Sequence, residues 1–595
     1  MILKGIVFSY LAEYIMITFL KKLWNLLDKK EKGVFFLLLG MMCIGAYLEL
    51  LGIGLVLPII AALTNPVLLQ ENRILKLICD FLSPSSNKEF MLIMCFLVSI
   101  TFLFKTLFFI LLTKIQAQFT AGKCCKLQEE LFNAYIHAPY LYHLNKNTAE
   151  IFSNFGQLKS AFSSAMISCM LLLTEFICIF FIFLSLFIFT PIATLAILLL
   201  ASGVFLFIFL TVKRYSNELG KQDYACTLRS NKVTLETFQS MKEVKLHNCE
   251  NRYFQQFSGI IRQQKKINVK TVISGQAPRF LIEFFMVLGA MLLLGAFVCF
   301  DVANTSILLK LSLICIALIR LMPSFSRIQY NYTNLKILHM TFDNTFQDLF
   351  HTPQEKLLPA AGKKLALNKC IELKNISFAY VPGKNILNNI SFTIPVNSSC
   401  AFIGKTGCGK TTLADIIIGL ITPDTGTILA DGVSITENLV QWRNLIGYVP
   451  QHIQLFDDTI ASNVAFGIPE ENIDQAKLKK CLEMAQAWDF VSRLDEGVNT
   501  LIGENGLRLS GGQRQRLGIA RALYHDPEFL ILDEATSALD NETEKAFMDA
   551  VSFLHGKLTM LIIAHRLSTI TNCDSIIDLS NGSAVKKDLS GLEIR

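Results

Sequence analysis

Long apolar runs alternate with polar, basic segments through roughly the first 335 residues of this 595-residue chain. A membrane-spanning helix needs about 20 mainly apolar residues. The pattern therefore predicts six spans, near residues 34–63, 90–113, 165–189, 192–212, 280–300 and 306–326. From about Ile371 the pattern changes to short apolar strands and helical segments, which is typical of an α/β domain.

The distribution of Lys and Arg predicts how these spans are oriented. The loop from Lys213 to Lys270 holds twelve Lys and Arg against five Asp and Glu, and basic residues also cluster near the N-terminus. The connections at Thr190–Pro191 and Asp301–Thr305 are short and weakly charged. Because basic loops stay on the cytoplasmic side, both termini are expected in the cytoplasm. The net charge of +7 is then explained without a nucleic-acid partner.

The N-terminal segment differs from a signal peptide. Its apolar run, Ile6 to Leu20, is interrupted by Glu13, and no small-residue cleavage site follows. Apolar residues mixed with a basic end instead predict an amphipathic helix over residues 1–30 that lies on the cytoplasmic surface.

Two of the predicted connections are too long for simple turns: about 50 residues between spans two and three, and nearly 70 between spans four and five. Their helical periodicity indicates that the membrane helices continue into the cytoplasm and turn at short transverse helices. The candidate tips are Pro139–Ala149 and Thr227–Glu236. On the outer side, Asn65–Lys88 contains apolar residues at helical spacing, which predicts an interfacial helix.

The α/β half contains the sequence GKTGCGKT, which begins at Gly404 and follows a predicted strand. Glycines at this spacing let backbone N–H groups and a helix N-terminus face phosphate groups. The lysine is expected to reach the β/γ-phosphates, and Thr411 is expected to hold Mg²⁺ through its hydroxyl. The predicted ATP contacts in this loop are Gly404, Lys405, Thr406, Gly407, Cys408, Gly409, Lys410, Thr411 and Thr412.

A second apolar strand, Phe529–Leu532, ends in two acidic residues. Asp533 is placed to hold magnesium directly or through water, and Glu534 is placed to orient or deprotonate the attacking water. A further strand, in LIIAHR, ends at His565, which is expected to contact the γ-phosphate.

LSGGQ at residues 509–513 extends this motif set. Together with Gln451 in YVPQ, SALD at 537–540 and aromatic Tyr380 before the glycine loop, the chain resembles the ATP-binding cassette family. The resemblance implies that Tyr380 stacks on adenine and that Gln451 senses magnesium. It also implies contacts to ATP bound on the opposite subunit from Ser510, Gly511, Gly512, Gln513 and Asp540.

The order of the parts resembles a half-transporter of the exporter type. The expected fold is a six-helix transmembrane domain fused to an α/β P-loop nucleotide-binding domain. The expected boundaries are an elbow helix at 1–30, the membrane domain at 31–335, a linker at 336–369 and the nucleotide-binding domain at 370–595. One cassette per chain implies a homodimer with two ATP and Mg²⁺ sites. Cys408 stands where serine is common, so thiol reagents are expected to inhibit.

Ionisable residues inside the predicted spans are candidates for substrate binding. Lys105 and Arg320 each lie about 15 residues from the outer face, or about 22 Å deep at about 1.5 Å per residue. With Arg279 and Arg327 they would form a basic belt in a homodimer, suited to a phosphorylated headgroup. Ion pairing is the alternative, Arg279 with Glu283 and Lys105 with Glu49 or Glu175, while Arg327 would extend to the interface.

More narrowly, the chain resembles bacterial flippases for lipid-linked oligosaccharides. The shared features are Glu49–Leu63 in span one, the external amphipathic segment, the arginine spacing in span six and Glu243–His247 in the second cytoplasmic loop. This implies flipping of a polyprenyl-pyrophosphate-linked oligosaccharide across the bacterial inner membrane. Export of a peptide, a lipid or a hydrophobic drug is the alternative, and an ATP-gated channel or sensor is a third reading.

Overall fold

The computed structural model groups the chain into two compact units. Unit 1 comprises residues 1–138 and 145–353, and unit 2 comprises residues 139–144 and 354–595. The structure describes residues 18–55, 59, 87–189, 191–299, 305–355, 365–534, 548, 551–564, 570 and 573–587.

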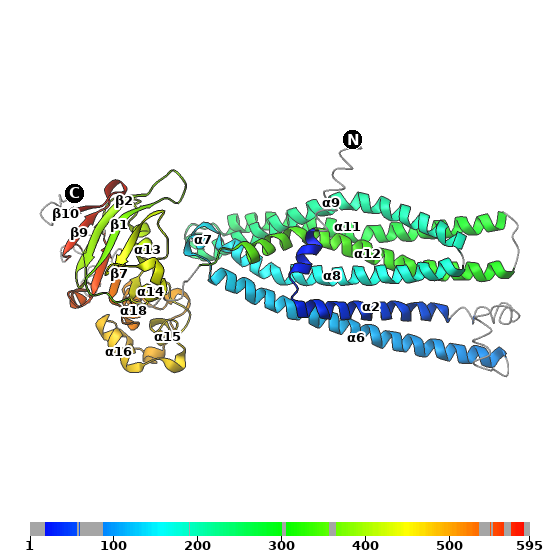
Figure 1. The fold of residues 1–595 in the computed structure, drawn as a ribbon, viewed down its shortest axis with the longest axis horizontal. Helices are drawn as coiled ribbons and strands as arrows, with labels where there is room; N and C mark the ends of the chain where they lie inside the picture. The colour runs from blue at the N-terminus through cyan, green and yellow to red at the C-terminus, as the bar shows by residue number, and fades with distance from the viewer. Residues whose placement is uncertain are drawn as a thin grey trace. The chain divides into compact units, whose positions relative to one another are not determined.

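Unit 1 is built from long helices (Figure 1). They are α2 (Lys29–Gly54), α6 (Asn87–Ile136), α8 (Thr148–Phe189), α9 (Pro191–Gln239), α11 (Glu250–Cys299) and α12 (Thr305–His351). Each contains all or most of one predicted span. Within the described residues, four segments are long and apolar enough to cross a membrane: Lys29–Gly52, Lys88–Ile136, Thr148–Ser185 and Glu250–Gly289. The membrane domain is therefore helical as predicted, and the number of six crossings stays a prediction.

Exposed apolar side chains gather on α2, α6, α8 and α11. On α6, Leu92 is 72% exposed and Phe96 is 69% exposed, and Leu103 and Ile110 are similarly open. Apolar side chains in such an exposed row are unfavourable in water and favourable in hydrocarbon. The surface of unit 1 thus matches a lipid environment.

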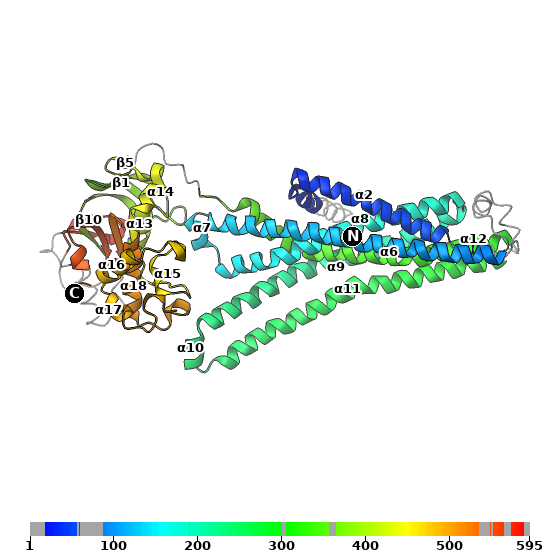
Figure 2. The same ribbon diagram turned by 90° about the horizontal axis from the view of Figure 1, so that it is seen from below.

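Inside unit 1, α12 packs along α8, α9 and α11, while α2 packs against α6 and α8. Glu31 at the start of α2 pairs with Lys123 and Lys126 of α6, each at 3.0 Å. Figure 2 shows α9 and α11 running together toward α10 (Met241–Leu246) and diverging there from α8. The helices are therefore far longer than a bilayer requires, as the long predicted connections implied.

The two predicted transverse helices had different outcomes. A six-residue helix, α7 (Tyr140–Asn145), lies inside the predicted tip Pro139–Ala149. The second prediction was wrong: Thr227–Glu236 belongs to α9, and the short helix is α10, which begins after Ser240. No glycine or proline lies at the break between α9 and α10. The helical periodicity of the sequence continues across this break, so periodicity alone does not locate it.

At its two ends, unit 1 departs in part from the expected boundaries. Residues 18–25 are helical, and Phe19 packs edge-on against Phe342 of α12 with ring centroids 4.7 Å apart. The expected linker, 336–369, begins inside α12, which continues to His351. The predicted external helix at Asn65–Lys88 lies almost wholly outside the described residues, as do residues 1–17 of the elbow helix.

Unit 2 contains two sheets. The six-stranded sheet has the order β10-β9-β3-β8-β7-β6, with β10 antiparallel to β9 and the other pairs parallel. Its strands are β3 (Ser399–Ile403), β6 (Ile446–Val449), β7 (Phe529–Asp533), β8 (Thr559–Ile563), β9 (Ser575–Asp578) and β10 (Val585–Lys587). The second sheet is antiparallel, β2-β1-β4-β5, made of β1 (Cys370–Phe378), β2 (Leu387–Pro395), β4 (Thr425–Ala430) and β5 (Val433–Ser434).

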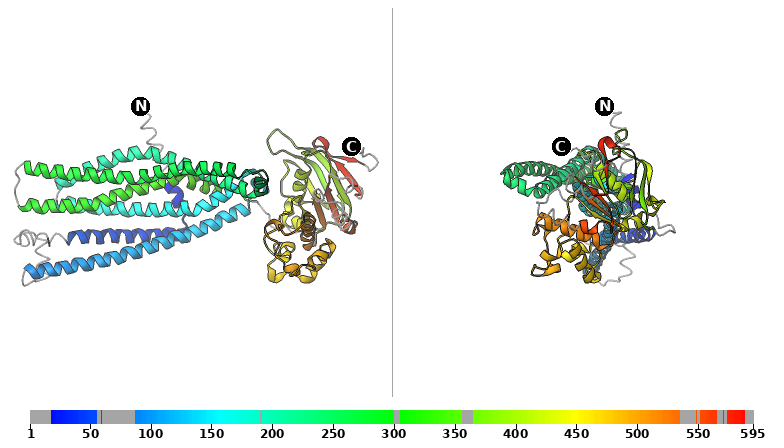
Figure 3. Two further views of the ribbon diagram at one scale, coloured as in Figure 1. Left: turned by 180° about the vertical axis from the view of Figure 1, so that it is seen from behind. Right: turned by 90° about the vertical axis from the view of Figure 1, so that its left-hand side faces the viewer.

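Side-chain alternation along the central strands creates two cores in unit 2. From β7, Leu530 and Leu532 enter a core with α15 (Ile460–Val464), α16 (Gln475–Met484) and α18 (Gly511–Tyr524). Phe529 and Ile531 enter the opposite core, with α13 (Lys410–Ile418), α14 (Leu439–Asn444) and the antiparallel sheet. In Figure 3 the green and red strands lie beside the yellow and orange helices. Because both faces are covered, the central strands are mainly apolar, as in other buried parallel sheets, and their polar residues Ser399, Thr559 and Asp533 stand at strand ends.

Candidate functional site

The glycine loop joins β3 to α13 and has the backbone of a phosphate cradle. Gly404, Gly407 and Gly409 all have positive φ, at 143°, 82° and 99°. A Cβ on Gly404 would lie 2.8 Å from Cys408 Sγ, and one on Gly409 would lie 2.8 Å from Leu387 Cδ2. All three positions therefore favour glycine for backbone conformation, and Gly404 and Gly409 also leave little space for a side chain, whereas a Cβ on Gly407 would meet nothing within 4 Å.

The lysine of this loop is buried and held by the loop itself. Lys410 Nζ donates to the carbonyl of Gly404 at 2.8 Å and to that of Lys405 at 3.4 Å. The side chain is only 5% exposed. Since α13 begins at Lys410, the ammonium group is kept at a helix N-terminus, where an anion is favoured.

Tyr380 lies beside this helix. Its hydroxyl is 3.3 Å from Thr412 Oγ1, and its ring packs edge-on against Phe378 with centroids 5.0 Å apart. The ring remains 39% exposed. An aromatic face open next to the glycine loop fits the predicted role of stacking on adenine.

The acidic strand end is partly buried in unit 2. Asp533, the last residue of β7, is 4% exposed, and its Oδ2 accepts from the hydroxyl of Tyr448 at 3.3 Å. Burial and then the negative charge of Asp533 raise the pKa of Asp415 to about 6. The same two causes raise the pKa of Tyr448. Negative charge is thus concentrated here, which favours a cation.

The donor set suits magnesium. Among the described residues, His, Cys, Asp and Glu form no group of three that would hold a metal by itself. A magnesium ion would instead use the Asp533 carboxylate with the Thr411 hydroxyl, the Gln451 amide oxygen, water and phosphate oxygens. Mg²⁺ takes oxygen ligands, keeps several waters and relies on few carboxylates, so these residues fit it.

Glu534 and Gln451 are brought together across the two strand ends. Gln451 Nε2 donates to Glu534 Oε2 at 2.6 Å. Glu534 has a left-handed backbone with φ of 47°, and its N–H donates to the carbonyl of Ile563 at 3.0 Å. A non-glycine residue in this conformation is held by its surroundings at a cost of about 1 kcal/mol. The two residues that the sequence assigns to water activation and magnesium sensing are therefore direct partners.

The LSGGQ segment forms the start of α18. Ser510 is its N-cap: Ser510 Oγ accepts from the Gln513 N–H at 3.3 Å, and the Ser510 N–H donates to Gln513 Oε1 at 2.8 Å. This reciprocal pair is a capping box. It orders the helix start, leaving Gly511 and Gly512 in the first turn with N–H groups that the helix itself does not bond.

Two predicted nucleotide contacts, His565 and Asp540, lie outside the described residues. Thr406 and Cys408 lie in the described loop, and Thr411 lies in the first turn of α13. Their contacts to a nucleotide stay predictions.

Three of the four residues in the predicted basic belt of unit 1, Lys105, Arg279 and Arg327, form ion pairs in the described part of the chain. Lys105 Nζ lies 3.2 Å from Glu49 Oε1, and Arg279 Nε lies 2.9 Å from Glu283 Oε1. Both pairs are those that the ion-pairing alternative named. Arg320 lies in α12, and its side chain is outside the described set.

The third pair joins Arg327 of α12 to Glu175 of α8. Arg327 Nε lies 2.6 Å from Glu175 Oε1, and its Nη2 donates to Oε2 at 3.4 Å, so the contact is fork-like. Cys178, one turn after Glu175, donates to Glu49 Oε2 at 3.3 Å. The Lys105–Glu49 and Arg327–Glu175 pairs therefore form one cluster that connects α2, α6, α8 and α12.

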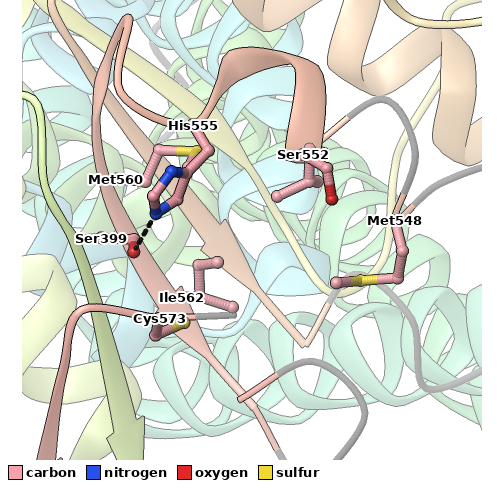
Figure 4. Close-up of a pocket in the computed structure, with 8 residues that line it drawn as sticks. Ser399, Met548, Ser552, His555, Met560, Ile562 and Cys573 are labelled. Atoms are coloured by element: carbon pink, nitrogen blue, oxygen red, sulfur yellow. Dashed lines mark hydrogen bonds between the residues drawn. The ribbon is translucent and has the colours of Figure 1, made fainter. Parts of the chain in front are cut away.

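A separate cavity of about 320 Å³ lies in unit 2 near Ser399, His555 and Cys573 (Figure 4). His555 Nε2 lies 3.1 Å from Ser399 Oγ and 3.2 Å from Asp574 Oδ2, and Ser399 Oγ also donates to Asp574. A hydrolytic triad needs the serine and the carboxylate on different ring nitrogens. Here one nitrogen meets both groups, so the cluster ties the start of β3 to the turn before β9.

The sequence reasoning missed two residues of the nucleotide site. Tyr448 opens the YVPQ motif, three residues before Gln451, and its position at the end of β6 beside β7 was the available signal. Asp415 had the weaker signal, a single acidic residue among the apolar residues Leu413–Ile418 of the helix that follows the glycine loop.

Comparison with protein families matches both parts of the chain. Residues 51–322 match the ABC transporter transmembrane region, and residues 387–537 match the ABC transporter model. A solved bacterial Atm1-family ABC exporter with ATP bound has the same fold, with a TM-score of 0.77 and 22% identity over 94% of this chain and 95% of the other.

Curated relatives named ATP-dependent lipid A-core flippase are similar over long stretches. The protein of Photorhabdus laumondii is 31% identical over 475 residues, 78% of this chain and 79% of the relative. That of Burkholderia thailandensis is 34% identical over 395 residues, and the match spans 63% of either protein. With its cassette motifs in place and its membrane helices matched, the chain belongs to the ABC transporter family, as an exporter-type half-transporter.

Proposed function

We propose that this chain acts as a homodimeric ATPase that flips a phosphorylated lipid from the cytoplasmic to the outer leaflet of the bacterial inner membrane. The observation that carries the ATPase part is the 2.6 Å hydrogen bond between Gln451 and Glu534, at the end of the strand that carries Asp533. The relatives named flippases support the lipid part.

The nucleotide chemistry follows from the residues of unit 2. The backbone N–H groups of the glycine loop and the Lys410 ammonium bind the phosphates, and the Tyr380 ring orients adenine. When bound, Mg²⁺ neutralises charge that develops on the phosphate oxygens. Glu534 then accepts a proton from the attacking water, while the Gln451 amide holds the carboxylate in one orientation.

The proposal that two copies of the chain act together rests on the LSGGQ segment. The capped start of α18 offers a serine hydroxyl and unbonded N–H groups, which form an anion site. Family resemblance assigns this site to ATP held by the other subunit. Two chains would then complete two nucleotide sites between them, with Asp540 adding a further contact.

An anionic headgroup is proposed from the cluster in unit 1. The side chain of Arg327 is 48% exposed while that of Glu175 is 8% exposed, so the arginine is the more accessible partner. The carboxylate occupies the fork that a phosphate oxygen pair would take. We propose that a headgroup phosphate competes with Glu175 for Arg327, and that Lys105, Arg279 and Arg320 add to the attraction.

The finer proposal is a polyprenyl-pyrophosphate-linked oligosaccharide, because pyrophosphate can bind two adjacent cations at once. Lys105 and Arg327 belong to one cluster, through Glu49, Cys178 and Glu175. The proposed topology places both termini in the cytoplasm, from the basic loop that includes α10. Cysteine accessibility at Ser240 and at Asn304 would test the orientation.

The function is tested in proteoliposomes that hold the purified protein. ATP-dependent flipping is measured for a polyprenyl-pyrophosphate-linked sugar, for lipid A-core, for phosphatidylcholine and for a peptide, with Glu534→Gln as the inactive control. Flipping of the pyrophosphate lipid above the others is expected. If only lipid A-core is flipped, lipid A-core takes the place of the polyprenyl lipid as the proposed substrate. If phosphatidylcholine or the peptide moves as fast as the pyrophosphate lipid, the proposal of an anionic headgroup is contradicted.

A further inference from the structure

A second cavity in unit 2, of about 520 Å³, lies where strands β7 and β8 begin. It is lined by one face of α16, by the end of α18 with the turn after it, and by residues 554–558. Small-molecule pockets have volumes of about 300–1,000 Å³, so a ligand fits here. The candidate nucleotide site uses the opposite end of β7, at Asp533, so the two sites are separate.

The floor of this cavity is apolar. Cys481 and Leu523 are each 4% exposed, and Leu554 is 1% exposed. Met484 and Leu558 are partly buried and pack against the same core. A hydrocarbon chain on this floor would be removed from water together with the surface that it covers, which is favourable.

The rim of the cavity is basic. Lys477, Lys480 and Lys557 line it with a single acidic residue, Asp526. Lys477 forms a salt bridge with Asp526, so that negative charge is already neutralised. In the part of the chain that the structure describes, Lys480 and Lys557 are in no ion pair, and Lys557 Nζ lies over the ring of Phe553, 3.5 Å from its centroid. Two ammonium groups are thus left to attract an anion.

The sequence of α16 explains why a basic rim adjoins an apolar floor. Lys477, Lys480, Cys481 and Met484 stand at helical spacing, so they share one face of the helix. The helix packs against α18 (Figure 2). The aliphatic stem of a lysine can lie along apolar surface while its ammonium group stays in water. One helix face therefore supplies both surfaces that an amphiphile requires.

The backbone of the lining segments is already hydrogen-bonded. The Asp526 N–H donates to the carbonyl of Leu523 at 3.1 Å. The Leu558 N–H donates to the carbonyl of Leu554, also at 3.1 Å. An extended peptide that adds to a sheet edge is recognised through free backbone groups, whereas a hydrocarbon chain needs none. The lining thus favours an amphiphile over a peptide segment.

We propose that this cavity binds an amphiphile with one anionic head and a single hydrocarbon chain, such as a long-chain fatty acid or an alkyl phosphate. The head lies near Lys480 and Lys557, and the chain lies on the apolar floor. Exposed ion pairs contribute little, so the chain provides most of the affinity and the lysines provide selectivity for an anion. The site is additional to the proposed transport function and does not depend on it.

The test uses the full-length protein in nanodiscs and a palmitate that carries a photoreactive diazirine on its chain. After illumination, the labelled peptides are identified by mass spectrometry. We expect label on peptides that contain α16 and residues 554–558. Unlabelled palmitate and hexadecyl phosphate should each compete for this label, whereas hexadecanol, which has the same chain without the charge, should not.

Charge variants test the rim. Lys480→Glu should lower labelling of unit 2 about threefold, and its combination with Lys557→Glu about tenfold, because attraction becomes repulsion. Lys479→Glu is the matched control and should label as wild type. Its side chain does not line the cavity: it pairs with Glu483 at 3.9 Å and lies over the ring of Trp488.

A filling variant tests the cavity without touching its buried floor. Ala476 is exposed in the first turn of α16 and lines the cavity. Ala476→Trp should fill the space and abolish labelling of unit 2. ATPase activity within about twofold of wild type would show that each variant is folded, since none of the changed residues belongs to the nucleotide site.

Three outcomes would overturn the proposal. The first is wild-type label confined to the helices of unit 1, and the second is competition by hexadecanol as strong as that by palmitate. The third is stronger competition by a peptide rich in Glu and Leu, which would assign the cavity to an acidic protein segment. Competition by either anionic amphiphile supports the proposal, and the stronger one identifies the head group. The readout needs neither ATP nor transport, so it decides this site even if the chain flips no lipid.

Discussion

Gln451 Nε2 and Glu534 Oε2 lie 2.6 Å apart, so the amide and the carboxylate form a direct hydrogen bond. Gln451 is separated from the end of β6 by a single proline, and Glu534 directly follows the last residue of β7. The bond fixes the orientation of the Glu534 carboxylate. The proposed base is therefore oriented before a nucleotide contributes any contact.

We expect Glu534→Gln to lower ATP hydrolysis by about 10²–10⁴-fold, because the amide cannot accept the proton from water. ATP binding should survive, and the variant should accumulate as an ATP-bound dimer. Phosphate release and size-exclusion chromatography with labelled ATP measure the two effects. Turnover close to wild type would remove the general-base assignment.

Gln513 is predicted to have two separable roles. Gln513→Glu keeps an acceptor for the Ser510 N–H, so the helix start should be as stable as in wild type. Gln513→Ala loses that acceptor and should destabilise unit 2 by about 0.5–1 kcal/mol. Both variants should lose ATPase activity, the glutamate by repelling phosphate. Thermal midpoints and ATPase rates check this, and full activity of Gln513→Glu would argue against a phosphate contact here.

The raised pKa of Asp415 predicts a dependence of stability on pH. The folded-state value of about 6 lies above the ordinary 3.8, so the folded state binds the proton more tightly than the unfolded state does. The contribution of Asp415 is then most favourable below about pH 4 and is lost as the pH rises to about 6. At pH 7.5, Asp415→Asn should be more stable than wild type by about 2–3 kcal/mol.

This effect is checked by comparing thermal midpoints of the two proteins at pH 4.5 and pH 7.5 without nucleotide or magnesium. The difference between their thermal midpoints should increase as the pH rises. As a control, the same comparison is made in an Asp533→Asn background, where the neighbouring charge is absent and the difference should be smaller. An Asp415→Asn variant that is equally destabilised at both pH values would contradict the assignment.

Arg327 and Glu175 should show non-additive effects. Arg327→Ala alone leaves a buried carboxylate without its partner, which costs about 3–5 kcal/mol. Adding Glu175→Gln should restore much of this stability. Flipping of a pyrophosphate lipid should stay impaired in the double variant, with ATPase activity largely intact, because the phosphate-binding cation is still missing. Normal flipping in the double variant would exclude Arg327 from headgroup binding.

Cys408 should report on occupation of the glycine loop. Its Sγ lies near Gly404, so a maleimide on this thiol would fill space that the phosphates need. We expect N-ethylmaleimide to inhibit ATPase activity and ATP to protect against it. Cys408→Ser should be resistant, whereas Cys370→Ser, which alters β1, should stay sensitive. If N-ethylmaleimide inhibits Cys408→Ser as strongly as wild type, the reactive thiol belongs to another cysteine.

The parts of the site that the sequence predicts well are local. The glycine loop, the acidic strand end and the capped LSGGQ helix each depend on a few consecutive residues, whose conformation is set by backbone chemistry. Gln451 and Glu534 are 83 residues apart, yet both follow the ends of neighbouring strands in a parallel sheet, so their meeting follows from topology.

What the sequence leaves open depends on long-range partners. Whether Lys105 faces a substrate or pairs with Glu49 depends on how α2 packs on α6. The pattern of apolar residues along the two helices is compatible with both arrangements. The hydrogen bonds that Asp348 accepts from Tyr135 and Asn154 join residues 213 and 194 positions apart, and nothing in the local sequence indicates them. The shift of the second transverse helix to α10 comes from a break that no glycine or proline announces.

The bonds from Lys410 to its own loop have a consequence for the entropy of ligand binding. The ammonium group has three N–H donors, and the carbonyls of Gly404 and Lys405 accept from it at 2.8 and 3.4 Å. The loop therefore holds the lysine in place without using all of its donors. A long, flexible side chain of this kind loses rotamer freedom when it is ordered. Because that freedom is already lost on folding, an incoming phosphate meets a preorganised cation and does not have to order it.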